Sequence, residues 1–268
     1  MRLFFSVHSV IAILLLLLSS SPALAGNLEP LGLQDAQLLP KNRAEFRIGL
    51  AHYDGPHNLF QPQDLDRRLT ELPSLTLNLG LGERVEGQLY YSYLYLREDG
   101  QDDKWDSGDL TLGLKVRLWQ ESLRVPALAI RLATKLPNAD NKDDLGTDEA
   151  DIFIDLLATR NFPFFSTYLN FGLAILGDPR PGSDSQDDAF RYGLGIKAPL
   201  MNNRLAGLLS IEGVEDSINS RCAIRAGLQL QLSDWLWDLG GSVGLDNKSE
   251  DWSLRTGLTI PFNLSANW

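Results

Sequence analysis

The chain has 268 residues, with 24 Lys or Arg against 35 Asp or Glu, so its net charge is −11, and 44% of its residues are hydrophobic. This length allows one large domain or two small ones. The acidic balance argues against a nucleic-acid-binding protein, which would carry a basic excess. A mean hydropathy of −0.13 excludes a bundle of membrane helices, and a single Cys excludes an internal disulfide framework or a four-thiolate metal site.

The N-terminal stretch has the form of a secretory signal peptide. Arg2 supplies the positive charge, residues 10–18 form the apolar run, and Ala23-Leu24-Ala25 is a small-x-small cleavage site. The apolar run is shorter than the roughly 20 residues that a spanning helix needs. We therefore expect residues 1–25 to be a cleaved signal peptide, residues 26–43 to be a short periplasmic N-terminal segment, and residues 44–268 to form the folded domain.

Beyond residue 43 the sequence alternates between apolar and polar residues, which is typical of β-strands, and a helical period is nearly absent. Residues 110–118 show the pattern most clearly, with Leu or Val at every even position and polar residues or Gly between them. We predict twelve strands, approximately at residues 44–53, 69–81, 84–96, 109–119, 126–136, 151–160, 166–177, 189–200, 204–215, 221–232, 235–246 and 252–262.

The connections between these strands alternate in length. Those after odd-numbered strands are long and polar, such as residues 54–68, whereas those after even-numbered strands are short, such as Gly82-Glu83 and Ser233-Asp234. An even number of strands of about ten residues, with short turns at one end and long loops at the other, is typical of a bacterial outer-membrane barrel. The sequence thus predicts an all-β, antiparallel transmembrane barrel with periplasmic turns and extracellular loops.

A water-soluble β-sandwich or lipocalin-like barrel is the alternative, and three features disfavour it. The apolar faces are rich in Leu while the opposite faces carry charges, so the apolar faces must meet lipid. Aromatic residues gather near the strand ends, as membrane girdles require; they are Trp119, Phe162, Phe164, Phe165, Trp235 and Trp237 at the turn end and Tyr53, Tyr93, Tyr95, Trp105 and Trp252 at the loop end. The last strand resembles the terminal strand that outer-membrane assembly machinery recognises, although Pro261 and the residues after Phe262 depart from its usual form.

The polar strand faces should line the lumen with nine basic and five acidic side chains, namely Glu45, Arg47, Glu86, Lys115, Arg117, Arg131, Lys135, Asp155, Arg191, Lys197, Glu212, Arg225, Asp238 and Arg255. Two interpretations stay open. Twelve strands could leave a lumen that conducts small solutes, with its basic excess favouring anions. Alternatively, the same charges pair with one another and brace a closed barrel. The sequence indicates on which face of the sheet each residue lies, but neither its position along the barrel axis nor the residue with which it pairs.

Three of the predicted loops, at residues 98–109, 140–151 and 178–188, hold sixteen of the 35 carboxylates. They could bind divalent cations or contact lipopolysaccharide, but neither the residue 140–144 run nor the residue 184–187 run has the spacing and Gly of an EF-hand loop. We therefore interpret them as a solvated surface and expect no metal site and no cofactor.

Enzyme signals are weak. Gly240-Gly241-Ser242-Val243-Gly244 matches G-x-S-x-G, but it lies inside a predicted strand without the helix that a nucleophile elbow needs. A surface hydrolase could pair His52 or His57 with Ser92 or Ser107, yet no spacing supports such a pairing. Cys222 looks like a small wall residue. We expect no enzymatic activity and no catalytic residues, and keep a surface hydrolase as the second alternative.

Several stretches resemble the MetA-pathway of phenol degradation family of outer-membrane, transporter-like barrels. They are residues 34–41, 71–75 and 108–115, and above all Lys135-Leu136-Pro137-Asn138 followed by residues 145–151, which read L-G-T-D-E-A-D. In the family this last pair reads approximately K-L-P-T-G and G-T-G-x-x-D, so Asn138, Ala139 and Asp148 depart from it. The resemblance implies an outer-membrane barrel that admits small compounds, aromatic ones among them, and carries over no catalytic residue.

Together these features predict a passive channel or uptake route for small solutes in the outer membrane of a Gram-negative bacterium. Its expected partners are lipid, lipopolysaccharide, the barrel assembly machinery and the solute, and no nucleic acid. The first alternative is a closed structural barrel whose acidic loops contact lipopolysaccharide or a partner protein.

Overall fold

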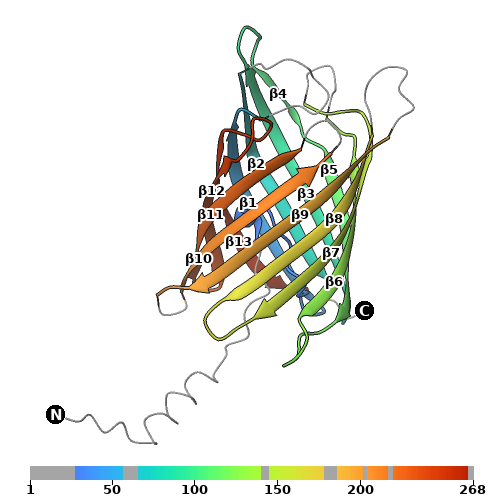
Figure 1. Ribbon diagram of the computed structural model, residues 1–268, viewed down its shortest axis with the longest axis vertical. Helices are drawn as coiled ribbons and strands as arrows, with labels where there is room; N and C mark the ends of the chain where they lie inside the picture. Colours follow the sequence, from blue (N-terminus) through green and yellow to red (C-terminus); the bar gives the residue numbers. More distant parts are fainter. Residues whose placement is uncertain are drawn as a thin grey trace, which may run out of the picture.

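The computed structural model describes residues 28–56, 66–139, 145–177, 186–201, 204–216 and 220–264, so the signal peptide, His57 and Trp268 lie outside the described residues. The described chain forms a closed antiparallel barrel (Figure 1). Its elements are η1 (Glu29–Leu31), β1 (Arg43–Asp54), β2 (Arg67–Gly80), β3 (Val85–Glu98), β4 (Lys104–Ser107), β5 (Leu110–Trp119), β6 (Ala127–Leu136), β7 (Asp151–Asn161), β8 (Ser166–Gly177), β9 (Gln186–Pro199), β10 (Leu205–Glu215), β11 (Arg221–Leu232), β12 (Trp235–Gly244) and β13 (Trp252–Asn263).

The predicted twelve-stranded antiparallel barrel is confirmed. Each long strand pairs with its neighbours in the chain, and β1 also pairs with β13 over its whole length, from Arg43 opposite Asn263 to Asp54 opposite Trp252. This last pairing closes the sheet and leaves no free edge among the long strands. No helix among the described residues is long and apolar enough to cross a membrane.

One strand was not predicted. Residues 97–108 were expected to be a loop, but β4 lies within them and pairs with residues 93–96 of β3. β4 and β5 pair with different parts of β3. Residues 85–90 of β3, nearer the turn end, pair with β5, so β4 extends the β5 side of the sheet toward the loop end. Acidic and polar residues dominate this stretch, so its alternation is too brief for the sequence to show a strand.

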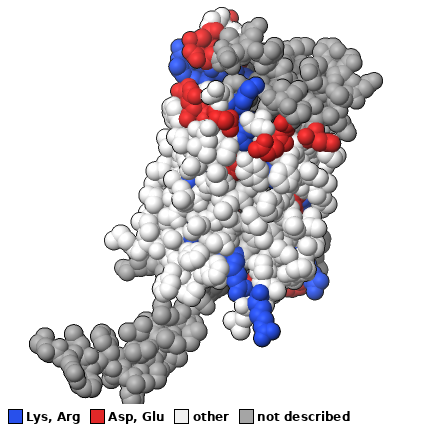
Figure 2. Space-filling view, viewed as in Figure 1, with Lys and Arg blue, Asp and Glu red and all other residues white. Residues whose placement is uncertain are grey.

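The outer wall is apolar between two charged ends. Large side chains such as Leu114, Leu173 and Leu194 are about half exposed there, and Figure 2 shows a wall almost free of charge between the two ends, where Lys, Arg, Asp and Glu gather. The predicted aromatic residues point outward at both ends except Tyr53, whose hydroxyl accepts a hydrogen bond from Arg255 inside the barrel. The outward assignment of Tyr53 was therefore wrong.

Residues 28–42, here called the N-terminal segment, run inside the barrel at the end that carries the short turns. The segment joins β1 through a tight turn in which the Arg43 amide donates to the Pro40 carbonyl, and the Asn42 amide donates to the Gly80 carbonyl of β2. Its apolar side chains are almost completely buried, with Leu31 0% and Leu33 3% exposed. The barrel is therefore partly filled by the residues that directly precede its first strand.

Candidate functional site: the barrel lumen

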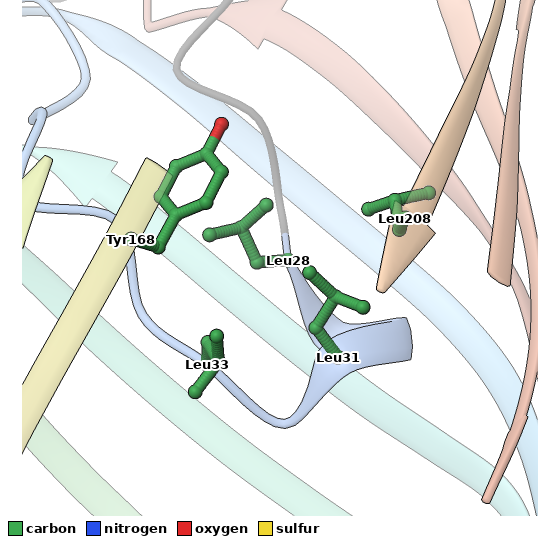
Figure 3. Close-up of a cluster of buried hydrophobic side chains, with 5 residues drawn as sticks. All are labelled: Leu28, Leu31, Leu33, Tyr168 and Leu208. Atoms are coloured by element: carbon green, nitrogen blue, oxygen red, sulfur yellow. The ribbon is translucent and has the colours of Figure 1, made fainter. Parts of the chain in front are cut away.

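The N-terminal segment is held in the lumen by two apolar clusters. In the first, Leu28, Leu31 and Leu33 pack with Tyr168 of β8 and Leu208 of β10, as Figure 3 shows. In the second, the side chains of Ala36 and Leu38 lie against small and apolar wall residues, namely Ala127, Ala129 and Leu157. Burial of these side chains is the main favourable contribution to docking, at about 25 cal/mol per Å² of apolar surface.

Wall side chains also satisfy the polar backbone of this segment. Asn170 accepts from the Gln34 amide at 2.7 Å and donates to the Gln34 carbonyl at 2.8 Å. The Leu39 amide donates to Glu86 at 2.8 Å, and the Ser210 hydroxyl donates to the Leu31 carbonyl at 3.0 Å. Buried backbone groups need such partners. The segment is therefore docked by specific hydrogen bonds as well as by apolar contact.

Asp35 is a buried carboxylate of the N-terminal segment. Its Oδ1 accepts from the amide of Gln37, two residues on, and from the hydroxyl of Thr159, which itself accepts from the Ala36 amide. Burial raises the pKa of Asp35 above its usual range, while these hydrogen bonds and nearby Lys115 oppose the shift. Docking therefore favours a protonated Asp35 more than exposure to water does.

The wall makes room for the segment by presenting glycines. A Cβ at Gly193 would overlap Leu33, and one at Gly195 would lie 2.5 Å from it. Two and three strands further along the wall, a Cβ at Gly227 would lie 3.2 Å from Pro30, and one at Gly240 would lie 3.0 Å from it. These inward-facing glycines are the sequence signal that could have indicated a segment packed inside the barrel.

Most predicted lumen charges are paired. Arg47 donates two hydrogen bonds to Asp238, at 2.7 and 2.9 Å, and the two side chains are 4% and 0% exposed. Lys115 lies 2.9 Å from Glu86. Arg225 binds Glu212 and, from the residue 245–251 loop, Glu250. Lys115–Glu86 and Arg225–Glu212 tie neighbouring strands together on the inner wall, whereas Arg47–Asp238 joins β1 to β12 across β13.

Lys135 lies at the loop end of the barrel. Its ammonium lies 2.8 Å from Asp151 and 3.3 Å from Asp109, and it donates to the Thr147 hydroxyl at 3.1 Å. The amides of Asn138 and Ala139 both donate to Asp109. The K-L-P and G-T stretches thus meet around one lysine, so in this chain they build a loop junction.

Four other predicted lumen residues lie at different positions along the barrel axis. Arg117 sits at the turn end and donates to the Glu83 carbonyl. Arg255 lies near the loop end, 5.6 Å from the ring centre of Tyr53. Lys197 lies in the turn-end half, opposite Ser166. Glu45 lies near the turn end of β1 and lines a cavity next to the N-terminal segment.

The structure adds lumen carboxylates that alternation did not assign. Asp35 comes from the N-terminal segment, Glu71 accepts from Tyr90, Asp109 and Asp151 contact Lys135, and Glu250 contacts Arg225. These carboxylates reach the lumen from the loops, the N-terminal segment and β2, and they offset part of the basic excess that the strand faces predict.

A cavity of about 290 Å³ remains beside the N-terminal segment. One side is formed by the segment, with Leu33, Asp35 and Leu39, and the other by the wall, with polar groups and Phe153. The residues that line its wall side are Glu45, Thr76, Asn78, Glu86, Gln88, Leu89, Tyr90, Thr111, Gly113, Lys115, Arg131, Phe153 and Arg191. This volume lies near the lower limit of typical small-molecule sites.

Among the described candidate hydrolase residues, His52 and Ser92 lie on opposite faces of the wall. A register shift between Glu71 and Ser74 in β2 turns Thr70 outward, where it bonds His52 at 2.8 Å, and the His52 ring lies 5.4 Å from the Trp252 ring in a tilted arrangement. Ser92 is buried on the inner face of β3. Within the described part of the chain, no group of three or more His, Cys, Asp or Glu is placed to hold a metal ion.

Comparison with solved structures shows the fold. The chain is similar to the COG4313 outer membrane channel from Pseudomonas putida F1, with a TM-score of 0.67, 13% identity, and coverage of 85% of this chain and 98% of that one. It is also similar to the NanC porin (TM-score 0.55, 9% identity, 81% and 98% coverage) and to the translocator domain of the autotransporter NalP from Neisseria meningitidis (0.52, 12%, 82% and 88%). No family model and no curated protein matches the sequence, so the phenol degradation family remains a prediction.

Proposed function

We propose that this protein lies in the outer membrane and provides a passive route for small solutes through its lumen, with the N-terminal segment as a plug that narrows the route. The fold is shared with an outer membrane channel and a porin. The apolar outer wall suits lipid contact, and the charged ends suit the two aqueous boundaries. The observation that carries the proposal is the polar cavity bounded on one side by the N-terminal segment.

The proposed orientation follows from the two ends of the barrel. Short turns, such as the one at Ser233 and Asp234, belong in the periplasm and the longer loops outside, after export by the signal peptide at residues 1–25. The partners are then membrane lipid, lipopolysaccharide at the acidic loops, the assembly machinery during insertion, and the solute. In this orientation the N-terminal segment enters the lumen from the periplasmic side.

Passage would require the N-terminal segment to shift or leave. The segment is attached only at its C-terminal end, through the turn at Pro40, whereas its other contacts with the wall are non-covalent. Segments held in this way can move while the barrel stays intact. The same segment therefore closes the lumen when docked and opens it when displaced.

A closed structural barrel is the second candidate, and a specific observation favours it. The paired charges, such as Arg47 with Asp238 and Lys115 with Glu86, brace the wall, and the N-terminal segment fills its turn-end half. A barrel of this kind would act through its acidic loops. It would conduct no solute whether the segment is docked or displaced.

A reversible disulfide separates the two candidates. Pro30→Cys with Gly227→Cys, in a Cys222→Ser background, places two Cβ atoms about 3.2 Å apart, slightly closer than the usual 3.5–4.5 Å. In planar bilayers we expect low conductance for the oxidised protein and a rise after reduction. Each single Cys variant is the control and should not respond to reductant.

Two results would decide against the proposal. If neither the reduced double variant nor a chain lacking residues 28–38 conducts ions from correctly folded protein, the closed structural barrel is the better description. If oxidised and reduced protein conduct equally, solutes pass without movement of the N-terminal segment, and its role as a plug is wrong.

A further inference from the structure

Strand register builds a row of charges across the inner wall, just above the N-terminal segment. Glu86 lies opposite Lys115, Lys115 opposite Arg131, and Arg131 opposite Asp155. Gly172 follows Asp155 in the row and lies opposite Arg191. A Cβ at Gly172 would overlap the Asp155 carboxylate, so this glycine leaves the space through which Asp155 and Arg191 meet across β8.

The part of this row from Arg131 to Arg191 carries two positive charges and one negative charge. Asp155 uses Oδ2 for Arg131, at 2.9 Å, and Oδ1 for Arg191, at 3.4 Å. Glu86 is already engaged by Lys115 and by the Leu39 amide. Arg191 makes the longer contact and keeps 36% of its side chain exposed, against 13% for Arg131. Both guanidinium groups line the cavity, so this corner attracts an anion.

The next row toward the loops is apolar and made of small residues. Gly113 lies opposite Ala133, Ala133 opposite Phe153, Phe153 opposite Ala174, and Ala174 opposite Ala189. Gly113 and Phe153 of this row line the cavity. Phe153 also packs against the buried cluster that includes Leu176, and the Arg191 guanidinium lies 5.1 Å from its ring centre.

We propose that this corner of the cavity binds a small organic anion, a carboxylate on a compact apolar or aromatic body. The carboxylate would accept hydrogen bonds from Arg191 and Arg131, whose planar groups suit carboxylate oxygens. The body would lie beside Phe153 and Gly113, which line the same cavity as the two arginines. This inference deepens the proposed function, on which it rests, by assigning the solute a chemical class and a binding position.

Binding of phenylacetate to the purified protein in detergent tests the site directly. Titration calorimetry should show binding of phenylacetate and at least tenfold weaker binding of phenylacetamide, which lacks the charge, and of phenethylamine, which reverses it. Arg191→Gln should lower phenylacetate affinity by roughly ten- to hundred-fold, the loss expected for hydrogen bonds to a charged group. Arg191→Lys keeps the charge and should retain part of the affinity.

Arg97→Gln is the matched control, because Arg97 is an exposed arginine near the loop end, with 59% of its side chain accessible. It changes the net charge equally and should leave affinity unchanged. Arg131 still pairs with Asp155 in the Arg191→Gln variant, so the barrel should fold, which its heat-dependent gel mobility would verify. The proposal is wrong if phenylacetate does not bind, if phenylacetamide binds equally, or if folded Arg191→Gln protein retains full affinity.

The test separates this site from the proposed route. Binding in detergent does not require conduction. If the protein binds phenylacetate but conducts under no condition, the proposed site stands and the proposed route is wrong. If the protein conducts ions but does not bind phenylacetate, the proposed route stands and the proposed site is wrong.

Discussion

Removing two leucines from the N-terminal segment should release it from the lumen. Leu31 and Leu33 are 0% and 3% exposed and belong to one buried cluster with Tyr168 and Leu208. A buried Leu→Ala substitution costs about 2–5 kcal/mol, so the double variant should lose about 4 kcal/mol of docking free energy even at the lower limit. Since about 1.4 kcal/mol is a factor of ten, the docked fraction relative to the displaced one should fall roughly 1000-fold.

Hydrogen exchange measures this release at defined positions. The amides of Gln34, Ala36 and Leu39 donate to wall side chains, so their exchange should accelerate strongly in the Leu31→Ala, Leu33→Ala protein while strand amides stay protected. Conductance should rise in parallel. Leu123→Ala is the control, because this turn leucine is 96% exposed and has no packing to lose. Unchanged exchange at the three amides would refute the reasoning that apolar burial holds the segment.

Three further predictions follow from the lumen contacts. Asp238→Asn should destabilise the barrel by about 3–5 kcal/mol, because Arg47 would lose its buried partner, and a lower urea midpoint of unfolding would show it. Lys135→Gln should loosen the loop junction, seen as faster exchange at residues 145–151, because the largely buried Asp109 and Asp151 would lose the cation that they share. The raised pKa of Asp35 means that the docked segment binds a proton more tightly than the displaced one. Docking should therefore be strongest at low pH and weaken as pH rises through that pKa, so conductance should increase as pH rises above the ordinary carboxyl range, and Asp35→Asn should remove most of the dependence.

The strands could be predicted from sequence because a membrane barrel wall imposes alternation on every residue. The segments predicted at residues 166–177 and 221–232 match β8 and β11 to the residue. β4 could not be predicted, because four residues are too few to establish a period among acidic neighbours. A strand is a local pattern, and local patterns are what a single sequence displays.

The contents of the lumen depend on contacts that alternation does not encode. It assigned Asp155 and Arg191 to the polar faces, but their meeting requires the register of β7, β8 and β9 and the absence of a side chain at Gly172. The N-terminal segment was expected to lie before the barrel, since its leucines have no strand period. Its position becomes clear only when Gly193 and Gly195 are seen to face the same space.

The position of the N-terminal segment also constrains the order of assembly. Residues 28–42 leave the ribosome before any strand, yet they dock on Gly193 of β9, Ser210 of β10 and Gly227 of β11. These contacts join residues more than 150 positions apart, and contacts of such long range form slowly because a large loop must close first. The segment that precedes the first strand is thus seated only after late strands are in place. A protease-resistant N-terminal segment would therefore be a marker of a completed barrel.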